Sequence, residues 1–474
     1  MRNIYNLLLI LFFFPAIGKA QIQLIYFTDA HQLYELDDVE GGRGGIARLK
    51  TIVDQSKKED KSTLTIHGGD FVGGVLYGGI YKGAHMPAAF NEIPVDIFNF
   101  GQHEFDYGVD HLLSLIRLSK GQFFTSNLVD AAHQPFNNLP TYLLKKVNGK
   151  QVLFIGLTDQ METTKKDERA KQADLFTSVE KVFSNVNLNL VDYIVAVTQM
   201  DLAKNKALVN RFPAIDLVLT EELEEYHTQI HYQNNVPIIA PSGNMSAVAK
   251  INLQSNKKTQ IEIISLDKEV SYDKDLRALE LHEKSSVDDL LQEKLADLKV
   301  DLDAFASLKE ESLAGNLITD AMRDRYQTDF AMIDGSGIRK SISQGNFTFE
   351  KVRTLLPFGN KMVVVQLKGK DLIDFITSYL INSKPKLVQI SGGSYQWNKT
   401  NNLVEMDQVK ADEIYTLVLN DYNFGKLKKF EKIIIDANHS DSVEDYIVLK
   451  DYIQKLKIIQ PKIENRIIIQ YGQE

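Results

Sequence analysis

Residues 95–108 read VDIFNFGQHEFDYG, an apolar run that passes directly into a group of polar side chains. The run VDIFNF has the length and the β-rich composition of a buried strand. After it, an imidazole and two carboxylates fall within four positions, at His103, Glu104 and Asp106. Open α/β sheets place their ligands at the carboxyl ends of strands. The stretch therefore predicts both a strand of such a sheet and part of a functional site.

The same pattern recurs through the first half of the chain. From Gln21 to about Leu266, short β-branched or aromatic runs alternate with amphipathic helical segments, which indicates a layered α/β fold. The runs end on polar residues, namely Asp29, His31, Asp70, Gln102, His103, Gln199, Glu222 and Glu224. One aspartate at a strand end is usually a cap or turn residue. Five strand ends on one sheet edge instead predict a site for hard divalent cations, which bind carboxylate, amide and imidazole groups.

The second half of the chain is organised differently. After Tyr272, a long charged segment with helical period and without Gly or Pro predicts a helical linker over residues 267–305. Residues 306–474 follow with mixed helical and strand-like patterns. A chain of 474 residues exceeds what a single core usually supports, so two domains are expected.

The amino terminus has the pattern of a secretory signal over residues 1–20. Arg2 precedes the apolar run IYNLLLILFFFPAI, and the small residues of GKA offer a cleavage site before Gln21. An uncleaved anchor is the alternative, although the run is shorter than the roughly 20 residues of a spanning helix. The chain has no cysteine, which suits a bacterial periplasm better than a disulfide-rich setting. We predict a secreted, periplasmic protein without stable membrane insertion.

The charge balance excludes one class of partner. Removing Arg2 and Lys19 with the signal leaves 52 basic against 63 acidic residues, a net charge of −11. Non-specific nucleic-acid binding needs a basic face, so no nucleic-acid partner is expected. A small anionic ligand held by a few local donors stays compatible with this charge.

Several motifs together resemble those of a known family. FTDAHQLYEL, GGIARL, HGGDFVGG and FGQHEFDYG are similar, in order and spacing, to motifs of bacterial 5′-nucleotidases and UDP-sugar hydrolases, which are calcineurin-like metallophosphoesterases. ESLAGNLITDAMR, DGSGIRKSI and TLLPFGNKMVVVQLKG resemble the family's nucleotide-binding domain. The resemblance implies a four-layer α/β/β/α domain over 21–266, the helical linker, and an α+β 5′-nucleotidase-type domain over 306–474. Because the family's domains rotate about the linker, it also implies a hinge near 290–310.

The implied metal ligands are only partly those of the family. Asp29, His31 and Asp70 match its pattern, whereas Gln102 replaces an asparagine and Gln199 a histidine. Glu222 and Glu224 stand where the family has two histidines. One reading is an inactive member that has lost its second metal and kept the fold. The other is a site rebuilt with oxygen donors, although Gln102 is one methylene longer than asparagine.

In the rebuilt site, the resemblance implies one or two ions. Asp29, His31, Asp70 and Glu224 would hold the first; Asp70, Gln102, Gln199 and Glu222 would hold the second. Such an oxygen-rich set favours Mg²⁺, Mn²⁺ or Ca²⁺ over Zn²⁺.

The resemblance also assigns roles to the residues of the opening stretch. His103 matches the family's catalytic histidine and Asp106 the carboxylate that orients it; a positioned imidazole can stabilise a transferring phosphoryl group or protonate the leaving oxygen. His227 and His231, spaced i and i+4, could share a helix face and replace missing ligands. A surface face is the more common reading of such a pair, and we do not include them in the predicted site.

The second domain carries the implied substrate contacts. Phe358 and Tyr422 correspond to two rings that clamp a nucleobase, and packing is the alternative role for both. Arg339 matches an arginine that would bind phosphate, and Asp334 would add negative charge close to that ligand. The family's ribose-binding GGDG loop is replaced by GKLKKF, and a further arginine before EESLAGN is absent.

From the sequence, the leading hypothesis is an exported, monomeric, metal-dependent phosphoesterase that hydrolyses nucleotides or related phosphate esters. The alternative is a catalytically inactive family member that binds a nucleotide or small anion.

Overall fold

The computed structural model describes residues 22–73, 76–161, 167–254, 258–382, 387–427, 434–435 and 443–471. The predicted signal segment, residues 1–20, lies outside these ranges. The chain divides into two compact units, Met1–Ser285 and Ser286–Glu474.

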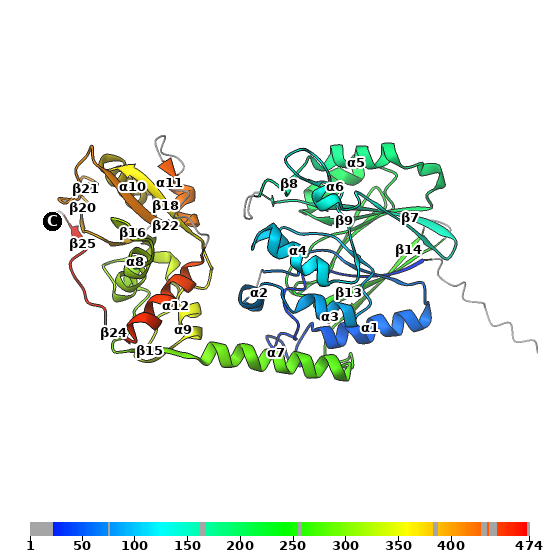
Figure 1. Ribbon diagram of the computed structural model, residues 1–474, viewed down its shortest axis with the longest axis horizontal. Coiled ribbons are helices and arrows are strands. Elements are labelled where there is room, and N and C mark those ends of the chain that lie inside the picture. Colours follow the sequence, from blue (N-terminus) through cyan, green and yellow to red (C-terminus); the bar gives the residue numbers. More distant parts are fainter. Residues whose placement is uncertain are drawn as a thin grey trace, which may run out of the picture. The chain divides into compact units, whose positions relative to one another are not determined.

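The first unit is built on two six-stranded sheets that pack face to face (Figure 1). The first sheet has the order β14-β13-β1-β2-β3-β4, and the second β11-β12-β10-β9-β7-β6. The strands of the first sheet are β1 (Ile22–Phe27), β2 (Leu64–His67), β3 (Ile97–Phe98), β4 (Gln122–Phe123), β13 (Ala247–Leu253) and β14 (Thr259–Ser265). Those of the second are β6 (Leu143–Val147), β7 (Lys150–Thr158), β9 (Tyr193–Gln199), β10 (Leu217–Leu219), β11 (Gln229–Gln233) and β12 (Val236–Ala240). The short strands β5 (Leu128–Val129) and β8 (Lys171–Gln172) pair separately.

Helices cover the outer face of each sheet. α5 (Leu175–Asn185) and α6 (Leu202–Arg211) pack on the second sheet. On the opposite side of the unit lie α1 (Ile46–Glu59), α3 (Met86–Glu92) and α4 (Val109–Leu118), with the short α2 (Leu76–Tyr81) nearby (Figure 1). The predicted four-layer α/β/β/α arrangement is confirmed.

Strand β1 shows why its sequence is apolar at every position except Gln23. Ile22, Leu24 and Tyr26 belong to the core between the two sheets. On the other face, the ring of Phe27 lies 5.9 Å from that of Phe90 in α3. A strand buried on both faces needs apolar residues at every position rather than at alternate ones.

Parallel pairing places the carboxyl ends of the central strands at one edge. Phe27 of β1 pairs with His67 of β2, and His67 pairs with Phe98 of β3. In the second sheet, Thr158 of β7 pairs with Gln199 of β9. The polar residues that follow the strands of each sheet therefore lie at one edge of that sheet, and a hydrogen bond from Nε2 of Gln199 to Oγ1 of Thr28 joins the two edges. The prediction of a single sheet edge is wrong, because Gln199 and the glutamates after β10 follow strands of the second sheet.

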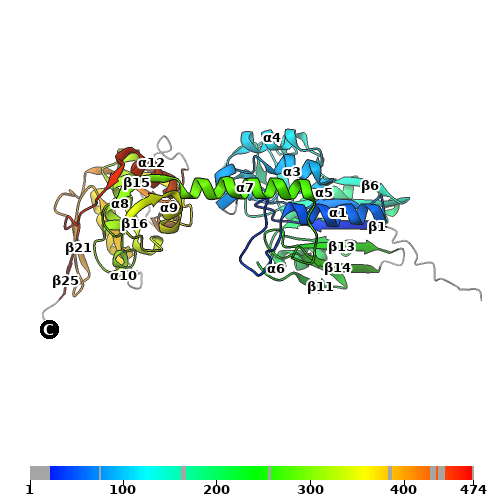
Figure 2. The ribbon, with the colours of Figure 1, turned by 90° about the horizontal axis from the view of Figure 1, so that it is seen from below.

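The predicted linker is helical only in part. α7 (Lys274–Gln292) runs beside α1 (Figure 2), and Glu280 accepts a hydrogen bond from the backbone of Ala47 at 2.8 Å. Residues 294–298, which were expected to be helical, form strand β15 instead. β15 pairs with β17 (Gly345–Thr348) and with β24 (Ile458–Ile459). These distant partners supply backbone hydrogen bonds that override the local helical pattern.

The second unit is α+β. A five-stranded sheet has the order β19-β16-β22-β18-β23, and β21, β20 and β25 form a smaller one. The larger sheet contains β16 (Phe330–Asp334), β18 (Met362–Lys368), β19 (Val388–Ser391), β22 (Ile414–Asn420) and β23 (Ile434–Ile435). The smaller contains β20 (Tyr395–Asn398), β21 (Leu403–Glu405) and β25 (Ile467–Gln470). The helices are α8 (Leu313–Tyr326), α9 (Phe349–Leu355), α10 (Gly369–Asn382), α11 (Asp421–Leu427) and α12 (Asp445–Leu456).

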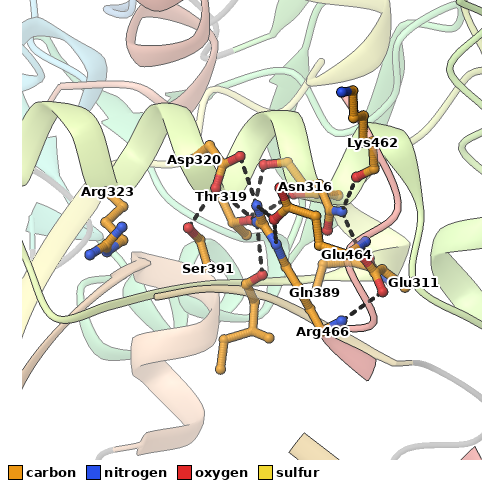
Figure 3. A network of polar contacts seen from close by, with 12 residues as sticks. Glu311, Asn316, Thr319, Asp320, Arg323, Gln389, Ser391, Lys462, Glu464 and Arg466 are labelled. Carbon is orange, nitrogen blue, oxygen red and sulfur yellow. Dashed lines mark hydrogen bonds and ion pairs between the residues drawn. The ribbon is translucent and has the colours of Figure 1, made fainter. Parts of the chain in front are cut away.

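A polar network ties the last described segment to α8 (Figure 3). Glu311 accepts hydrogen bonds from the backbone N–H groups of Glu464 and Arg466, each at 2.7 Å. The Arg466 guanidinium contacts both carboxylate oxygens of Asp320, at 2.8 and 3.0 Å. The ESLAGN motif thus has a structural role, since it begins α8 and anchors residues 464–466.

A search of the described residues found no helix with the length and hydrophobicity needed to cross a membrane.

Candidate active site

The loop after β3 is held against the end of β2 by a buried carboxylate. Glu104 accepts hydrogen bonds from the backbone N–H groups of Asp70, Phe71 and Gly101, at 3.0, 2.8 and 2.8 Å. A Cβ at Gly101 would lie 2.1 Å from Oδ1 of Asp70, so only glycine fits there. Glu104 thus positions the backbone around Asp70. The sequence assigned no role to Glu104, although its place next to His103 could have indicated one.

Two aspartates leave their strands in a strained conformation. Asp29 and Asp70 have φ values of 55° and 59°, in the left-handed region. The Asp29 N–H donates to the carbonyl of Gly69 at 3.0 Å, which holds the ends of β1 and β2 together. Non-glycine residues in this region cost about 1–3 kcal/mol and are concentrated at functional sites.

His103 and Asp106 form a hydrogen-bonded pair on the short 3₁₀ helix His103–Phe105. Nδ1 of His103 donates to Oδ2 of Asp106 at 2.8 Å. Burial lowers the pKa of His103, but the hydrogen bond and charge of Asp106 oppose it, and the pKa is raised overall. The backbone N–H of His103 also donates to Oδ1 of Asp70 at 2.8 Å.

His31 lies beside this pair as a neutral imidazole. Its ring centroid is 5.6 Å from that of His103. Burial, and secondarily the charge of His103, lower the pKa of His31 to about 3. Its Nδ1 is buried and has no hydrogen-bond partner among the described residues.

The two glutamines at the strand ends each leave one amide oxygen without a donor. Gln199 is 1% exposed; its Nε2 donates to Oγ1 of Thr28 at 3.0 Å, next to Asp29. Oε1 of Gln199 and Oε1 of Gln102 are buried and have no partner in the described part of the chain. Buried acceptors of this kind are rare in native proteins unless water or an ion binds them.

Glu222 and Glu224, which follow β10, lie in different surroundings. The backbone N–H of Glu222 donates to Oδ2 of Asp29 at 3.1 Å, and its carboxylate accepts from the N–H of Asn244 at 3.0 Å. The side chain of Glu224 is 52% exposed, and its nearest ionic partner is His227, at 3.6 Å. The structure therefore brings Glu222 to the site and leaves Glu224 at the surface.

His227 and His231 do not share a helix face. Residues 229–233 form strand β11, and Nε2 of His231 contacts Oε1 of Gln229 at 2.7 Å. The antiparallel pairing of β11 with β12 decides this conformation.

Several carboxylates without a Lys or Arg ion-pair partner in the described part of the chain lie around Asp29. Burial, and then the charge of Glu221, raise the pKa of Asp29 to about 7. Burial, followed by neighbouring carboxylates, raises the pKa of Glu221 to about 7 and that of Glu222 to about 8. The pKa of Asp70 is raised as well, first by burial and then by Glu104. Within the described ranges, none of these four carboxylates forms an ion pair with Lys or Arg.

These residues fit a hard divalent cation only if the amide oxygens are included. The described residues contain no group of three or more His, Cys, Asp or Glu side chains placed to hold a metal. The unpartnered atoms of His31 and Gln102 lie at the same sheet edge as Asp29 and Asp70. That of Gln199 lies at the end of β9 in the second sheet, where its Nε2 bonds Thr28, and the three add amide and imidazole donors to the carboxylates. This composition suits Mg²⁺, Mn²⁺ or Ca²⁺.

In the second unit, two exposed rings lie on adjacent segments. Phe358 and Tyr422 are 59% and 51% exposed. The backbone N–H of Asp421 donates to the carbonyl of Lys361 at 2.8 Å, which joins the two segments. The Arg339 guanidinium lies 5.5 Å from the centroid of the Phe358 ring.

Asp334, which was predicted to add negative charge close to the ligand, has a cationic partner within the protein. Asp334 is buried, Tyr379 donates a hydrogen bond to its carboxylate, and Nζ of Lys426 lies 3.5 Å from it. Lys426 also donates to the hydroxyl of Tyr379 at 2.7 Å. Lys426 belongs to GKLKKF, so the segment that replaces the family's GGDG loop neutralises Asp334.

Each of the two units matches the sequence profile of a known protein domain. The sequence profile of calcineurin-like phosphoesterases matches residues 22–220, and that of the 5′-nucleotidase C-terminal domain matches residues 294–433. The chain belongs to the 5′-nucleotidase family. Members of this family are phosphoric ester hydrolases, and the resemblance inferred from the motifs is confirmed.

The similar proteins share only a low sequence identity with this chain. Human 5′-nucleotidase is 22% identical over 97% of this chain and 92% of its own length. The endonuclease YhcR of Bacillus subtilis is 25% identical over 85% of this chain, which spans only 37% of the endonuclease. A 5′-nucleotidase precursor from Thermus thermophilus has the same fold, with a TM-score of 0.62 and 22% identity over 94% of this chain and 99% of its own.

The carboxylate cluster predicts how the stability of the metal-free protein depends on pH. Asp29, Glu221 and Glu222 have folded-state pKa values of about 7, 7 and 8, above the ordinary value of about 4. The folded state therefore holds more protons than the unfolded state between about pH 4 and 8, and stability falls as pH rises through this range. Buried His31 has the opposite effect, but only below about pH 6.5.

We accordingly expect the melting temperature in EDTA to fall by about 5 °C between pH 6.5 and 8.5. Glu222→Gln should flatten this slope, whereas the matched change Glu224→Gln at the surface should leave it unchanged. Differential scanning fluorimetry at three pH values measures both effects. A melting temperature that is constant or rises over this interval would contradict the proposed burial of charge.

Proposed function

We propose that this 5′-nucleotidase-family protein is an exported, divalent-metal-dependent phosphoesterase that releases phosphate from nucleotides or related phosphate esters. The observation that carries the proposal is the His103–Asp106 pair, with Nδ1 and Oδ2 2.8 Å apart, at the same sheet edge as Asp29 and Asp70. The unpartnered acceptors of His31 and Gln102 at that edge, and of Gln199 at the end of β9 in the other sheet, support a bound cation.

Asp29, His31, Asp70, Gln102, Gln199 and Glu222 are the proposed cation-binding residues. A divalent cation bound there would neutralise charge on the phosphoryl oxygens and make water a stronger nucleophile. The buried carboxylates support this role because, without a cation, they have no ionic partner in the described part of the chain.

His103 is proposed to act on the leaving group. Its Nδ1 is engaged by Asp106, which fixes the ring and leaves Nε2 to act on the substrate. Because its pKa is raised, a larger fraction of His103 is protonated at neutral pH than for an ordinary histidine. A protonated Nε2 can donate to the ester oxygen as the bond to phosphorus breaks. His31, held neutral, cannot supply that proton.

Nucleotides are the proposed substrate class because the second unit offers exposed rings and cations. Phe358 and Tyr422 present ring faces on which a base can stack, and Arg339 lies beside Phe358. Stacking contributes about 1–3 kcal/mol per base without discriminating between bases. The name of the human relative, 5′-nucleotidase, supports the same class.

Truncation of a ring tests this assignment. We expect Phe358→Ala to raise the KM for a nucleoside monophosphate about tenfold and to leave kcat/KM for a simple aryl phosphate unchanged, because an aryl phosphate does not need the base-binding ring. Phe305→Ala is the matched control, since Phe305 is 65% exposed in the same unit. An equal loss on both substrates would contradict a role in base stacking.

A phosphate-release screen tests the function itself. The protein without residues 1–20 would be incubated with nucleoside mono-, di- and triphosphates, a nucleotide sugar and an aryl phosphate, each with Mg²⁺, Mn²⁺, Ca²⁺ or Zn²⁺. Metal-dependent release from at least one nucleotide is the expected result. Binding of nucleotide without release under any metal would favour the alternative, an inactive binding protein.

Export rests on the sequence of residues 1–20 and has its own test. Expression of the full chain in a bacterium, followed by osmotic shock, should give a periplasmic protein whose amino terminus is Gln21. A full-length amino terminus in the membrane fraction would instead support an uncleaved anchor.

A further inference from the structure

We infer that Lys426 positions the Tyr422 ring for base stacking and thereby strengthens the binding of nucleotides. The inference deepens the proposed function and rests on it, because it presupposes that a base stacks on Tyr422. No role was predicted for Lys426, which belongs to the segment GKLKKF. Its contacts are formed only in the folded second unit.

The ammonium group of Lys426 lies between two tyrosine rings. Nζ is 4.2 Å from the centroid of the Tyr379 ring and 4.4 Å from that of the Tyr422 ring. Tyr379 is 3% exposed and packs in the core of the second unit, whereas Tyr422 is 51% exposed. A cation close to the face of an aromatic ring is attracted by the ring quadrupole. Lys426 thus connects an exposed ring to the buried core.

Two buried groups fix the ammonium group in this place. Nζ donates to the hydroxyl of Tyr379 at 2.7 Å and lies 3.5 Å from Oδ2 of Asp334. Asp334 is 1% exposed, and the Tyr379 hydroxyl donates to its carboxylate. Moving the ammonium group away would take the cation from a buried carboxylate, which is strongly unfavourable. The position of Nζ is therefore set from the interior of the unit.

The backbone that carries both side chains is fixed as well. Tyr422 and Lys426 are four residues apart on α11, so their side chains lie on one face of this helix. Between them, Asn423 is fully buried. Its Oδ1 accepts from the N–H of Asp334 at 3.3 Å, and its Nδ2 donates to the Tyr379 hydroxyl at 3.1 Å. These bonds hold α11 against the end of β16.

A ring held in this way costs less to order when a base binds. An exposed tyrosine otherwise samples several rotamers, and fixing such a side chain on binding lowers the affinity. Lys426 contacts one face of the Tyr422 ring, and the ring is still half exposed, so ring surface remains for a base. The role that follows for Lys426 is to position the ring, not to contact the substrate.

Asp334 links this contact to the arginine proposed to bind phosphate. Its carboxylate accepts from the N–H of Ser336 at 2.8 Å and begins the 3₁₀ turn Gly335–Gly337. Arg339 follows two residues later, with its guanidinium 5.5 Å from the centroid of the Phe358 ring. A change of the carboxylate alone would disturb several parts of the site at once, so the test uses the other end of the ion pair.

Nucleotide binding tests the role without relying on catalysis. Adenosine monophosphate would be titrated calorimetrically in EDTA into the natural protein, Lys426→Met, Lys426→Arg and the control Lys399→Met. We expect Lys426→Met to weaken binding about threefold to tenfold, whereas Lys426→Arg, which keeps a cation over the ring, should stay within about twofold of the natural protein. Lys399 makes a similar contact in the same unit, 4.7 Å from the centroid of the exposed Tyr471 ring, and its change should have no effect.

A double-mutant cycle with Tyr422→Leu separates positioning of the ring from direct contact with the substrate. If Lys426 acts through Tyr422, Lys426→Met should cause no further loss of affinity in a protein that already carries Tyr422→Leu. The same loss in both backgrounds, or an unchanged affinity in Lys426→Met, would overturn the inference.

The double variant Asp334→Asn/Lys426→Met tests for a general effect of an unpaired buried charge. Removing both charges should return the melting temperature close to that of the natural protein. Binding of adenosine monophosphate should stay weak, because the Tyr422 ring still lacks its cation. Recovery of the affinity in the double variant would show that the loss came from the buried charge, and would overturn the positioning role.

Failure of the proposed function gives a different result. A natural protein that does not bind adenosine monophosphate, or a Tyr422→Leu variant that binds it as tightly as the natural protein, would overturn base stacking on this ring and the inference together. Weaker binding by Tyr422→Leu with unchanged binding by Lys426→Met would overturn the inference alone and leave the proposed function intact.

Discussion

Replacing His103 by glutamine should lower kcat for phosphate release by a factor of about 10²–10⁴. The imidazole can carry a proton to the leaving oxygen at neutral pH, because Asp106 orients it and raises its pKa. Glutamine keeps a polar side chain of similar length but cannot transfer a proton. The KM should change little if binding depends mainly on the cation site and the second unit.

The matched control is His227→Gln, which makes the same change at an exposed histidine and should leave kcat within about twofold. Asp106→Asn should give an intermediate loss, since the imidazole stays in place but loses the charge that supports its protonation. A fall in kcat with substrates that have a poor leaving group, but not with aryl phosphates, would identify proton donation specifically. Unchanged kcat in His103→Gln with all substrates would contradict the proposed role.

Asp70→Asn should abolish metal-dependent hydrolysis, with a loss of about 10³-fold or more in kcat/KM at fixed Mn²⁺. Asp70 is buried at the end of β2, and its strained backbone and the hydrogen bond from the His103 N–H fix its carboxylate at the centre of the site. Asparagine can accept the same hydrogen bond, so the change removes charge while preserving shape. Steady-state rates at several Mn²⁺ concentrations measure the effect, together with calorimetric affinity.

The metal-free Asp70→Asn protein should melt at a temperature equal to or above that of the natural protein, because a buried carboxylate with a raised pKa is removed. This separates loss of the cation from loss of the fold. Asp110→Asn, at an exposed position of α4, is the control and should retain full activity. Retention of Mn²⁺ affinity in Asp70→Asn would mean that the cation lies elsewhere.

The sequence predicted the fold class and the family because those depend on local patterns. Largely apolar runs such as IQLIYF predict strands buried on both faces, and β1 has apolar contacts on each side. The pairing of His103 with Asp106 is similarly local, since one 3₁₀ turn spans the two residues. The polar residues after β1 and β2 lie at one edge because parallel strands end together, whereas Gln199 after β9 reaches them from the second sheet through its hydrogen bond to Thr28.

Segments whose conformation depends on distant partners were not predictable in the same way. Residues 294–298 follow a helical pattern, yet they form β15 because β17 and β24 supply its hydrogen bonds. His231 lies on a strand for the same reason, through β12. In both cases tertiary pairing outweighs the weak local preference.

The identity of the family and the order of the site motifs were thus determined by the sequence alone, because motif spacing and strand period are properties of neighbouring residues. Only the tertiary structure decided which of Glu221, Glu222 and Glu224 faces Asp29, and that Lys426 neutralises Asp334. Side-chain direction beyond the end of a strand follows from the backbone of the loop. That backbone is set here by Tyr26, Asp29 and Arg43, which lie far from the glutamates in sequence and come close only when the sheets pack.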